Sequence, residues 1–427
     1  MTWRDVRRQA ALLLLITILW GCAAEDFSRL HPHTEAEEQA YTRLFPYYVD
    51  ICATSQIQKK PGFGASDRGG VGGHMGFFLR GACADRDAHY PVLHLCRPGE
   101  EDGVGIGMDA HFSSAKWSAA RGRSFFFHGG MSPDETLTPA RYTQILQQAR
   151  QDGVLDGISF HEDRFDEKPA AVSEEDWKYQ LTAGTDFALG MGRGSYCARV
   201  PVSQKDMLQI IDFMNAQNAP YRSGKEVFRW SVFTDNCGHL AHNALSAAEY
   251  WPEWPIDRPM LLAIFDFPVP KNEYVNVMMR SQSLPLEDVA ALYRDDDIRA
   301  MLLSENRLPP GPGVLSVFEP PQARNQVYDV DNLMLLFYDE AIIGRYRHCF
   351  QDIQSEPRFY DLHANILWWH DRYAQLIASR HPAEWWLQRL TLTPAGRADF
   401  RIFYDRYYEY LDRQLDWTTQ ALHQLGN

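Results

Sequence analysis

The N-terminal 22 residues constrain this chain most, because they decide in which compartment everything behind them folds. Three arginines and one aspartate among the first nine residues give a positively charged start. Ala10–Trp20 follows as an apolar run of 11 residues. Such a run is too short to span a bilayer and is typical of the apolar part of an export signal. We therefore predict that residues 1–21 are a signal peptide and that the remaining chain is exported.

The apolar run leads directly to Cys22, with Leu19 three residues before it and Gly21 just before it. This pattern resembles the bacterial lipobox, in which the cysteine is lipidated and becomes the first residue of the mature chain. The resemblance implies a lipid anchor at Cys22 and a tether over residues 22–45. Ala23 resembles an outer-membrane sorting signal of Gram-negative lipoproteins. We expect a lipid-anchored protein of the cell envelope, at the outer membrane facing the periplasm; a secretory signal with an incidental cysteine is the alternative.

The composition is that of a globular protein, with 45% hydrophobic and 23% charged residues. These proportions exclude a disordered chain or a collagen-like fibre. No apolar run reaches 18 residues, so no transmembrane helix is predicted. The formal net charge of -14 argues against a general nucleic-acid binder. The expected partner is therefore a membrane, reached through the lipid, and not a nucleic acid.

An exported chain can form disulfides, since the compartment is oxidising. Apart from Cys22 the cysteines are Cys52, Cys83, Cys96, Cys197, Cys237 and Cys349. They could form three disulfides, or they could leave a reactive thiol. Cys83 and Cys96 flank a predicted hairpin and are the first choice for a pair, but spacing alone does not fix the connectivity.

Hydrophobic periodicity predicts an α+β fold, in which short loops make most strands antiparallel. Segments with strand character are Met75–Cys83, Val92–Cys96, Val104–Met108, Ser124–His128 and Tyr196–Val202. Predicted helices among them are Pro139–Gln151 and Gln204–Gln217, the second with Ser203 as N-cap.

Beyond this region the chain changes character. Residues 305–324 are rich in proline and glycine and are predicted to be a linker. Residues 325–427 have helical length and many aromatic side chains, which predicts an α-helical C-terminal domain. The α+β domain would then occupy residues 46–304. The aromatic side chains could pack this helical domain, or could form a surface for lipid headgroups or glycan.

A cysteine at the start of a predicted helix is the strongest sign of chemistry. Cys237 stands where a helix through Leu245 would begin, with Asn236 or Asp235 as its cap. A helix N-terminus favours the thiolate, and its backbone N–H groups could stabilise an oxyanion. Cys237 could equally be a buried small side chain or half of a disulfide.

Activation of a thiol needs a base, and His74 at the start of an apolar strand could supply it. Asp109, at the end of a later strand, is our choice for the group that would fix the tautomer of the imidazole, ahead of His111 and His94. The plainer interpretations are a structural or surface role for His74 and a turn or cap role for Asp109.

These motifs resemble those of the circularly permuted papain-like superfamily, in which histidine precedes cysteine. That superfamily includes NlpC/P60-type proteins and lecithin:retinol acyltransferase-like enzymes. The spacing is most similar to periplasmic papain-like domains related to bacterial lipoprotein transacylases, on the strength of His74 after a glycine and of Asn236-Cys237 opening a helix. The resemblance covers about residues 46–250, and Asp109 stands where the family has an asparagine. It implies an antiparallel sheet with papain-like helix packing and a catalytic cysteine–histidine pair.

Together these features predict a cysteine-dependent acyltransferase or hydrolase that acts on an acyl or amide bond through an acyl-enzyme. Acyl lipid, acylated lipoprotein and peptidoglycan peptide are the candidate substrates. A peptidoglycan peptide hydrolase and a non-catalytic envelope-binding lipoprotein are the alternatives. No cofactor is expected. A metal site of Cys237, His239 and His242 is not expected either, because no second cluster completes four ligands.

Overall fold

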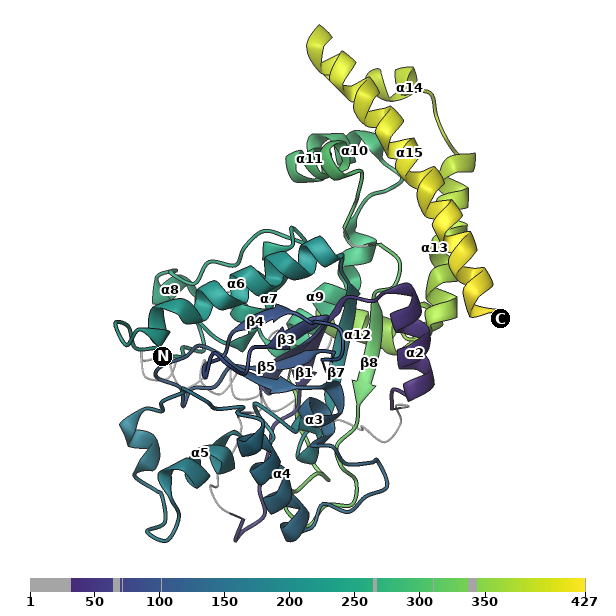
Figure 1. Cartoon of the computed structure of the whole chain (residues 1–427). Helices are drawn as coiled ribbons and strands as arrows, with labels where there is room; N and C mark the ends of the chain where they lie inside the picture. Colours follow the sequence, from purple (N-terminus) through teal and green to yellow (C-terminus); the bar gives the residue numbers. More distant parts are fainter. Residues whose placement is uncertain are drawn as a thin grey trace, which may run out of the picture.

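The computed structural model describes residues 32–63, 70, 72–100, 102–263, 267–309, 311–336 and 344–426. The predicted signal peptide and Cys22 lie outside these residues. The described chain is a mixed α/β structure around one large antiparallel sheet, with helices above, below and beyond it (Figure 1). The predicted α+β class is confirmed at this level.

The main sheet has six strands in the order β6-β5-β2-β1-β7-β8, and each pairs antiparallel with its neighbours. Its strands are β1 (Tyr48–Thr54), β2 (His74–Arg80), β5 (Val104–Gly107), β6 (Ser118–Arg121), β7 (Ser195–Pro201) and β8 (Leu315–Glu319). A separate hairpin consists of β3 (Ala82–Ala84) and β4 (Leu93–Leu95).

Helices surround the sheet and extend from it. The α-helices are α2 (Glu35–Leu44), α3 (Arg123–His128), α4 (Pro139–Gln151), α5 (Glu174–Thr182), α6 (Gln204–Arg222), α7 (Cys237–Ala247), α8 (Met260–Ala263), α9 (Pro270–Ser283), α10 (Val289–Arg294), α11 (Asp296–Glu305), α12 (Arg345–Ser355), α13 (Leu362–Ala378), α14 (Ala383–Leu387) and α15 (Pro394–Leu425). Short 3-10 turns are η2 (Glu162–Phe165), η3 (Leu189–Met191) and η4 (Pro357–Phe359).

Both faces of the sheet are covered, so β1 is buried along its whole length. Helix α9 packs on one face, where its Tyr274 ring lies 5.9 Å from Tyr196 of β7. Helix α3 packs on the other face, and its approach to β5 needs a residue without a side chain. A Cβ on Gly105 would lie 1.9 Å from the Phe126 ring. Burial on both faces explains why the strands read as short apolar runs rather than as alternating patterns.

A second hydrophobic core joins α10 and α11 to the C-terminal helices α13, α14 and α15. Its centre consists of aromatic side chains such as Trp369, Tyr373, Phe403 and Tyr407. In Figure 1 α15 (yellow) lies alongside α13 and reaches beyond the sheet, with the C-terminus at its end nearer the sheet. The predicted C-terminal helical region is therefore confirmed, and α10 and α11 from the preceding segment pack in the same core.

Two local predictions were wrong. Residues 124–128, expected to be a strand, belong to α3, which Gly122 and Gly129 bound with φ of 75° and 61°. Three consecutive phenylalanines there look like a buried strand, but a short helix between the two glycines also buries all of them. The proline-rich segment 305–324 is more than a linker, because β8 within it pairs with β7 as the edge strand of the sheet.

Two disulfides close the described structure. Cys83–Cys96 spans the β3–β4 hairpin as expected, and Cys52–Cys197 links directly paired positions of β1 and β7. Cys237 and Cys349 are free thiols. The four disulfide cysteines therefore leave the predicted reactive thiol available.

Candidate thiol site at the end of strand β2

Cys237 is the first residue of α7, and Asn236 is its N-cap as predicted. The Asn236 side-chain oxygen accepts hydrogen bonds from the amides of Gly238, at 2.7 Å, and His239, at 3.1 Å. In return Nδ1 of His239 accepts from the Asn236 amide at 3.1 Å. This reciprocal cap fixes where the helix begins, because it satisfies donors that have no partner within the helix. The helix therefore begins with the thiol in its first turn.

The thiol of Cys237 contacts the backbone of β2. The amide of Met75 donates a hydrogen bond to Sγ of Cys237 at 3.3 Å. This amide is available because β5 pairs with β2 only over Phe77–Leu79. Sγ thus lies against the peptide bond between His74 and Met75, so the fold brings the two predicted motifs together across 162 residues of sequence.

The environment of Cys237 favours a protonated thiol. The side chain is buried, and burial raises the pKa of the thiol to about 11. Hydrogen bonds from the amides of Met75 and Gly238 and the positive charge of Arg193 act in the opposite direction without overcoming burial. The thiol of the described structure is therefore neutral at physiological pH.

His74 is neutral as well. Burial, with a smaller contribution from the charge of Arg193, lowers the pKa of its imidazole to about 3. A hydrogen bond to the backbone of Thr185 opposes this shift. Nε2 of His74 is buried and has no hydrogen-bond partner among the described residues. In the part of the chain that the structure describes, no hydrogen bond therefore joins the His74 ring to the Cys237 thiol. The two residues are linked only by the bond from the Met75 amide, next to His74, to the thiol.

Asp109 follows β5 and does not contact the His74 ring by any hydrogen bond of the described structure. One of its side-chain oxygens accepts from the His111 amide at 3.0 Å. The carboxyl group also interacts with that of Asp186, whose pKa is raised well above its ordinary value by burial and by Asp109. The group that touches the imidazole is instead the backbone of Thr185, next to Asp186 in sequence.

Arg193 is the residue that sequence reasoning missed. Its guanidinium is buried and donates to the backbone oxygens of Gly184 (2.7 Å) and Ser55, and to Oγ1 of Thr185 at 3.1 Å. Burial lowers its pKa to about 10, against the attraction of Asp109, Cys237 and Asp186. A lone arginine between two glycines, in Gly192-Arg193-Gly194, was the only sequence signal for it.

The remaining histidines considered from the sequence have other surroundings. His242 stacks on Trp251 at 4.2 Å, and its Nδ1 lies 2.6 Å from Glu273. His94 lies on the β3–β4 hairpin beside Glu100. His111 lies beside Asp109, with Nε2 at 3.5 Å from its carboxylate. No group of three or more metal-ligating side chains was found in the described ranges.

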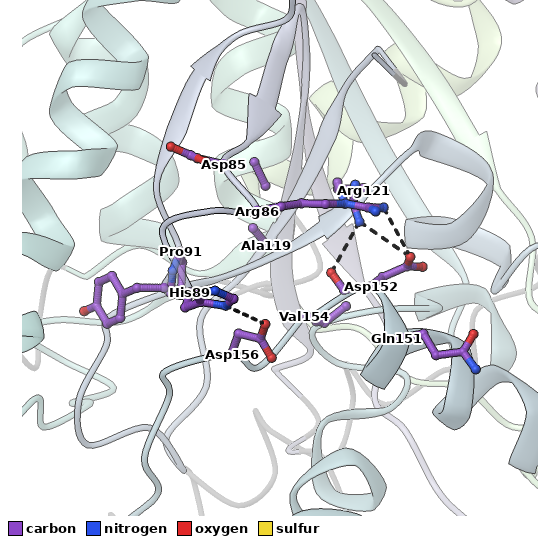
Figure 2. A pocket seen from close by; sticks show the side chains of 13 residues that line it. Asp85, Arg86, His89, Pro91, Ala119, Arg121, Gln151, Asp152, Val154 and Asp156 are labelled. Atoms are coloured by element: carbon purple, nitrogen blue, oxygen red, sulfur yellow. Dashed lines mark hydrogen bonds and ion pairs between the residues drawn. The ribbon is translucent and has the colours of Figure 1, made fainter. Parts of the chain in front are cut away.

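A separate polar pocket of about 210 Å³ lies between the β3–β4 hairpin and the end of α4 (Figure 2). Its charges are mixed and largely matched: Arg86 and Arg121 lie 3.6 and 3.5 Å from Asp152, and His89 lies 3.9 Å from Asp156. Its lining includes neither His74 nor Cys237. This pocket therefore brings no predicted site residues together, and the candidate site is the end of β2, where Cys237 and His74 meet.

Comparison of the chain with protein-family models, curated proteins and solved structures gives no match. Within the described ranges, the helices are all too short or too polar to cross a membrane.

Proposed function

We propose that this protein is an exported, lipid-anchored cysteine acyltransferase or hydrolase of the cell envelope, with a papain-like arrangement of Cys237 and His74. One observation carries the proposal: the Cys237 thiol, in the first turn of α7, accepts the Met75 amide next to His74 at 3.3 Å. Catalytic cysteines of this class need a helix N-terminus and a nearby imidazole. Both lie here at one end of β2.

The reaction would begin from the neutral pair. Sγ of Cys237 attacks the carbonyl carbon of an acyl or amide bond while its proton passes to Nε2 of His74. The carbonyl oxygen takes the electron pair of the C=O bond. The amides of Gly238 and His239 donate to Asn236, so the amide of Cys237 itself would stabilise this charge. When the C=O bond re-forms, the leaving group departs with the proton from His74, which leaves an acyl thioester on Cys237. Water or an amine then attacks the thioester, with His74 as base, and the acyl group is released or transferred.

The hydrogen bond to Thr185 suits this role, because a proton held on the nitrogen nearest the backbone leaves a lone pair on Nε2. The raised pKa of the thiol and the lowered pKa of the imidazole mean that no thiolate–imidazolium pair exists at rest. The proposal therefore includes activation on substrate binding, when the substrate carbonyl enters between the two groups.

A non-catalytic envelope-binding role is the second candidate. The observation that favours it is that Nε2 of His74 has no partner in the described part of the chain, whereas a preformed cysteine–histidine pair would share a hydrogen bond. Catalytic hydrogen bonds are, however, often long in the absence of substrate. Kinetics can separate the two candidates.

The test measures hydrolysis of p-nitrophenyl esters of short and long fatty acids by the full chain and by the Cys237→Ser, His74→Ala and Cys349→Ser variants. Cys349 is the other free thiol of the described residues and serves as the matched control. We expect the first two variants to lose about 10³-fold or more in kcat/KM and the third to retain full rate. Equal rates for all four proteins would favour the binding role, and activity on peptidoglycan peptides alone would favour a peptidase.

A further inference from the structure

The loops on either side of α7 expose a group of large apolar side chains, which we call the apolar rim. It consists of Val227, Trp230, Val232, Met260, Leu261 and Leu262. Leu261 is 77% exposed, Leu262 62% and Val227 55%, whereas most leucines and valines among the described residues are buried. Concentrated exposure of this kind marks an interaction surface.

The segments beside the two halves of the rim both contact the residue that caps α7. Nδ2 of Asn236 donates to the backbone oxygens of Val232, at 2.7 Å, and Pro268, at 3.2 Å. The rings of Phe233 and Phe267 lie 5.1 Å apart and join the same two segments. The rim is therefore attached to the end of the helix that carries Cys237.

The second half of the rim is also anchored along α7. Asn243 donates to the Trp254 backbone oxygen at 2.9 Å and accepts from the Trp254 amide at 2.7 Å. A Cβ on Gly238 would lie 2.9 Å from the Pro268 ring, so this segment packs closely on the first turn. The apolar side chains thus project from loops and a one-turn helix that are held by α7, rather than lining a groove.

Two features indicate a membrane as the occupant. Residues 222–232, around the first half of the rim, carry three basic side chains and one acidic one, so this half suits anionic headgroups. Residues 251–262, which lead to and include the second half, carry two acidic side chains and one basic one. Protruding apolar side chains next to a tryptophan also suit a bilayer interface, because a bilayer, unlike a protein partner, does not need a surface complementary in shape to the rim.

The predicted anchor points to the same occupant. Cys22 precedes the first described residue, Pro32, by ten residues, a stretch that can extend about 35 Å. A lipid at that position would hold the folded body within reach of the bilayer.

We propose that the apolar rim inserts into the surface of an anionic phospholipid bilayer and holds the Cys237 end of α7 against it. Docking itself is independent of catalysis. Docking would present acyl groups of the membrane to Cys237, and this purpose alone rests on the proposed function.

The experiment places an environment-sensitive fluorophore on Leu261→Cys in a Cys349→Ser background of the full chain. The matched control is Ile402→Cys on α15, where the native side chain is 58% exposed. Each labelled protein is reconstituted into vesicles of phosphatidylethanolamine and phosphatidylglycerol. We expect a blue-shifted emission and lost access to aqueous acrylamide at position 261, and neither change at 402. Charge reversal at Lys225 and Arg229 should reduce the shift.

The outcomes distinguish docking from catalysis. A Cys237→Ala chain should show the same shift at 261, so loss of activity with retained docking would refute only the proposed enzyme. Equal exposure of both labels to acrylamide on vesicles would overturn the docking proposal. A shift that depends on protein concentration without vesicles would also overturn it, and would indicate a second copy of the chain on the rim. Far-UV circular dichroism of each variant shows whether it is folded.

Discussion

The amide of Met75 and the thiol of Cys237 are joined by a hydrogen bond of 3.3 Å, although the two residues are 162 positions apart. This contact fixes the first turn of α7 to the end of β2 and thereby brings the cysteine to the strand that begins with His74. Burial, and not this contact, sets the chemical state of the thiol, because the amide donors of Met75 and Gly238 do not offset the loss of water around the sulfur.

The first prediction concerns the reactivity of this thiol. With its pKa raised to about 11, only a fraction on the order of 10⁻⁴ is thiolate at pH 7. Alkylation of Cys237 by iodoacetamide should therefore be roughly a hundredfold slower than that of an exposed cysteine at neutral pH and should accelerate up to about pH 11. Peptide mass spectrometry measures this rate residue by residue. Rapid labelling below pH 7 would show that the thiol is already activated at rest.

The cap of α7 should contribute to stability. Replacing Asn236 by alanine removes the oxygen that accepts from two amides of the helix. It also removes the two hydrogen bonds that the Asn236 side chain donates. We expect a loss of about 1–2 kcal/mol in the free energy of unfolding, measured by urea titration. Asn236→Asp keeps the acceptor and should lose less. If both variants match the wild type, the cap does not hold the helix.

Acid should destabilise the fold through a buried ion network. Burial alone would raise the pKa of Glu319, but Arg123 and His128 outweigh it and lower the pKa to about 2. Arg123 also pairs with Asp50, which in turn accepts from Arg199 at 2.7 Å.

The sign of the pH effect follows from this shift. A carboxyl whose pKa is lower when folded stabilises the fold above its unfolded pKa of about 4.3, and this stabilisation is lost as the pH falls through the folded value. The ionised Glu319 contributes on the order of 3 kcal/mol to the free energy of unfolding, and this contribution is lost between about pH 4.5 and pH 2. Glu319→Gln should therefore be less stable than wild type at pH 7 and should depend less steeply on acid. Glu356→Gln, at a partly exposed pair with Arg358, is the control and should stay close to the wild type.

The two disulfides should differ in their effect. Cys52–Cys197 spans 145 residues and Cys83–Cys96 spans 13. Because a longer loop restricts the unfolded chain more, removal by paired alanine substitutions should cost about 5 kcal/mol for the first and about 3 kcal/mol for the second. Urea unfolding of the two double variants measures the difference. Equal losses would show that native packing, rather than loop closure, governs their contribution.

Much of the fold could be predicted from local sequence signals. Pro139–Gln151 has the bounds that its proline and its Asp152-Gly153 stop predict, and the hairpin disulfide follows from its position. The N-cap at Asn236 was also predictable, because it depends on two adjacent residues.

Other features depend on contacts distant in sequence. The pairing of β8 with β7 joins residues about 120 apart, and no local pattern distinguishes that strand from a loop. The role of Arg193 depends on the buried surroundings of Gly184 and Ser55, which the sequence does not place beside it. For the group that fixes the tautomer of His74 the sequence offers only side chains such as Asp109, whereas in the structure the imidazole bonds to the backbone of Thr185.

The most direct measurement of the central claim is a search for an acyl group on Cys237. The full chain is incubated with p-nitrophenyl palmitate, and the Cys237 peptide is examined by mass spectrometry before and after hydroxylamine. We predict a palmitoyl thioester on Cys237 that hydroxylamine removes and that forms about 10²–10⁴-fold more slowly in His74→Ala. An unmodified Cys237, or an adduct that forms at the same rate without His74, would contradict the account.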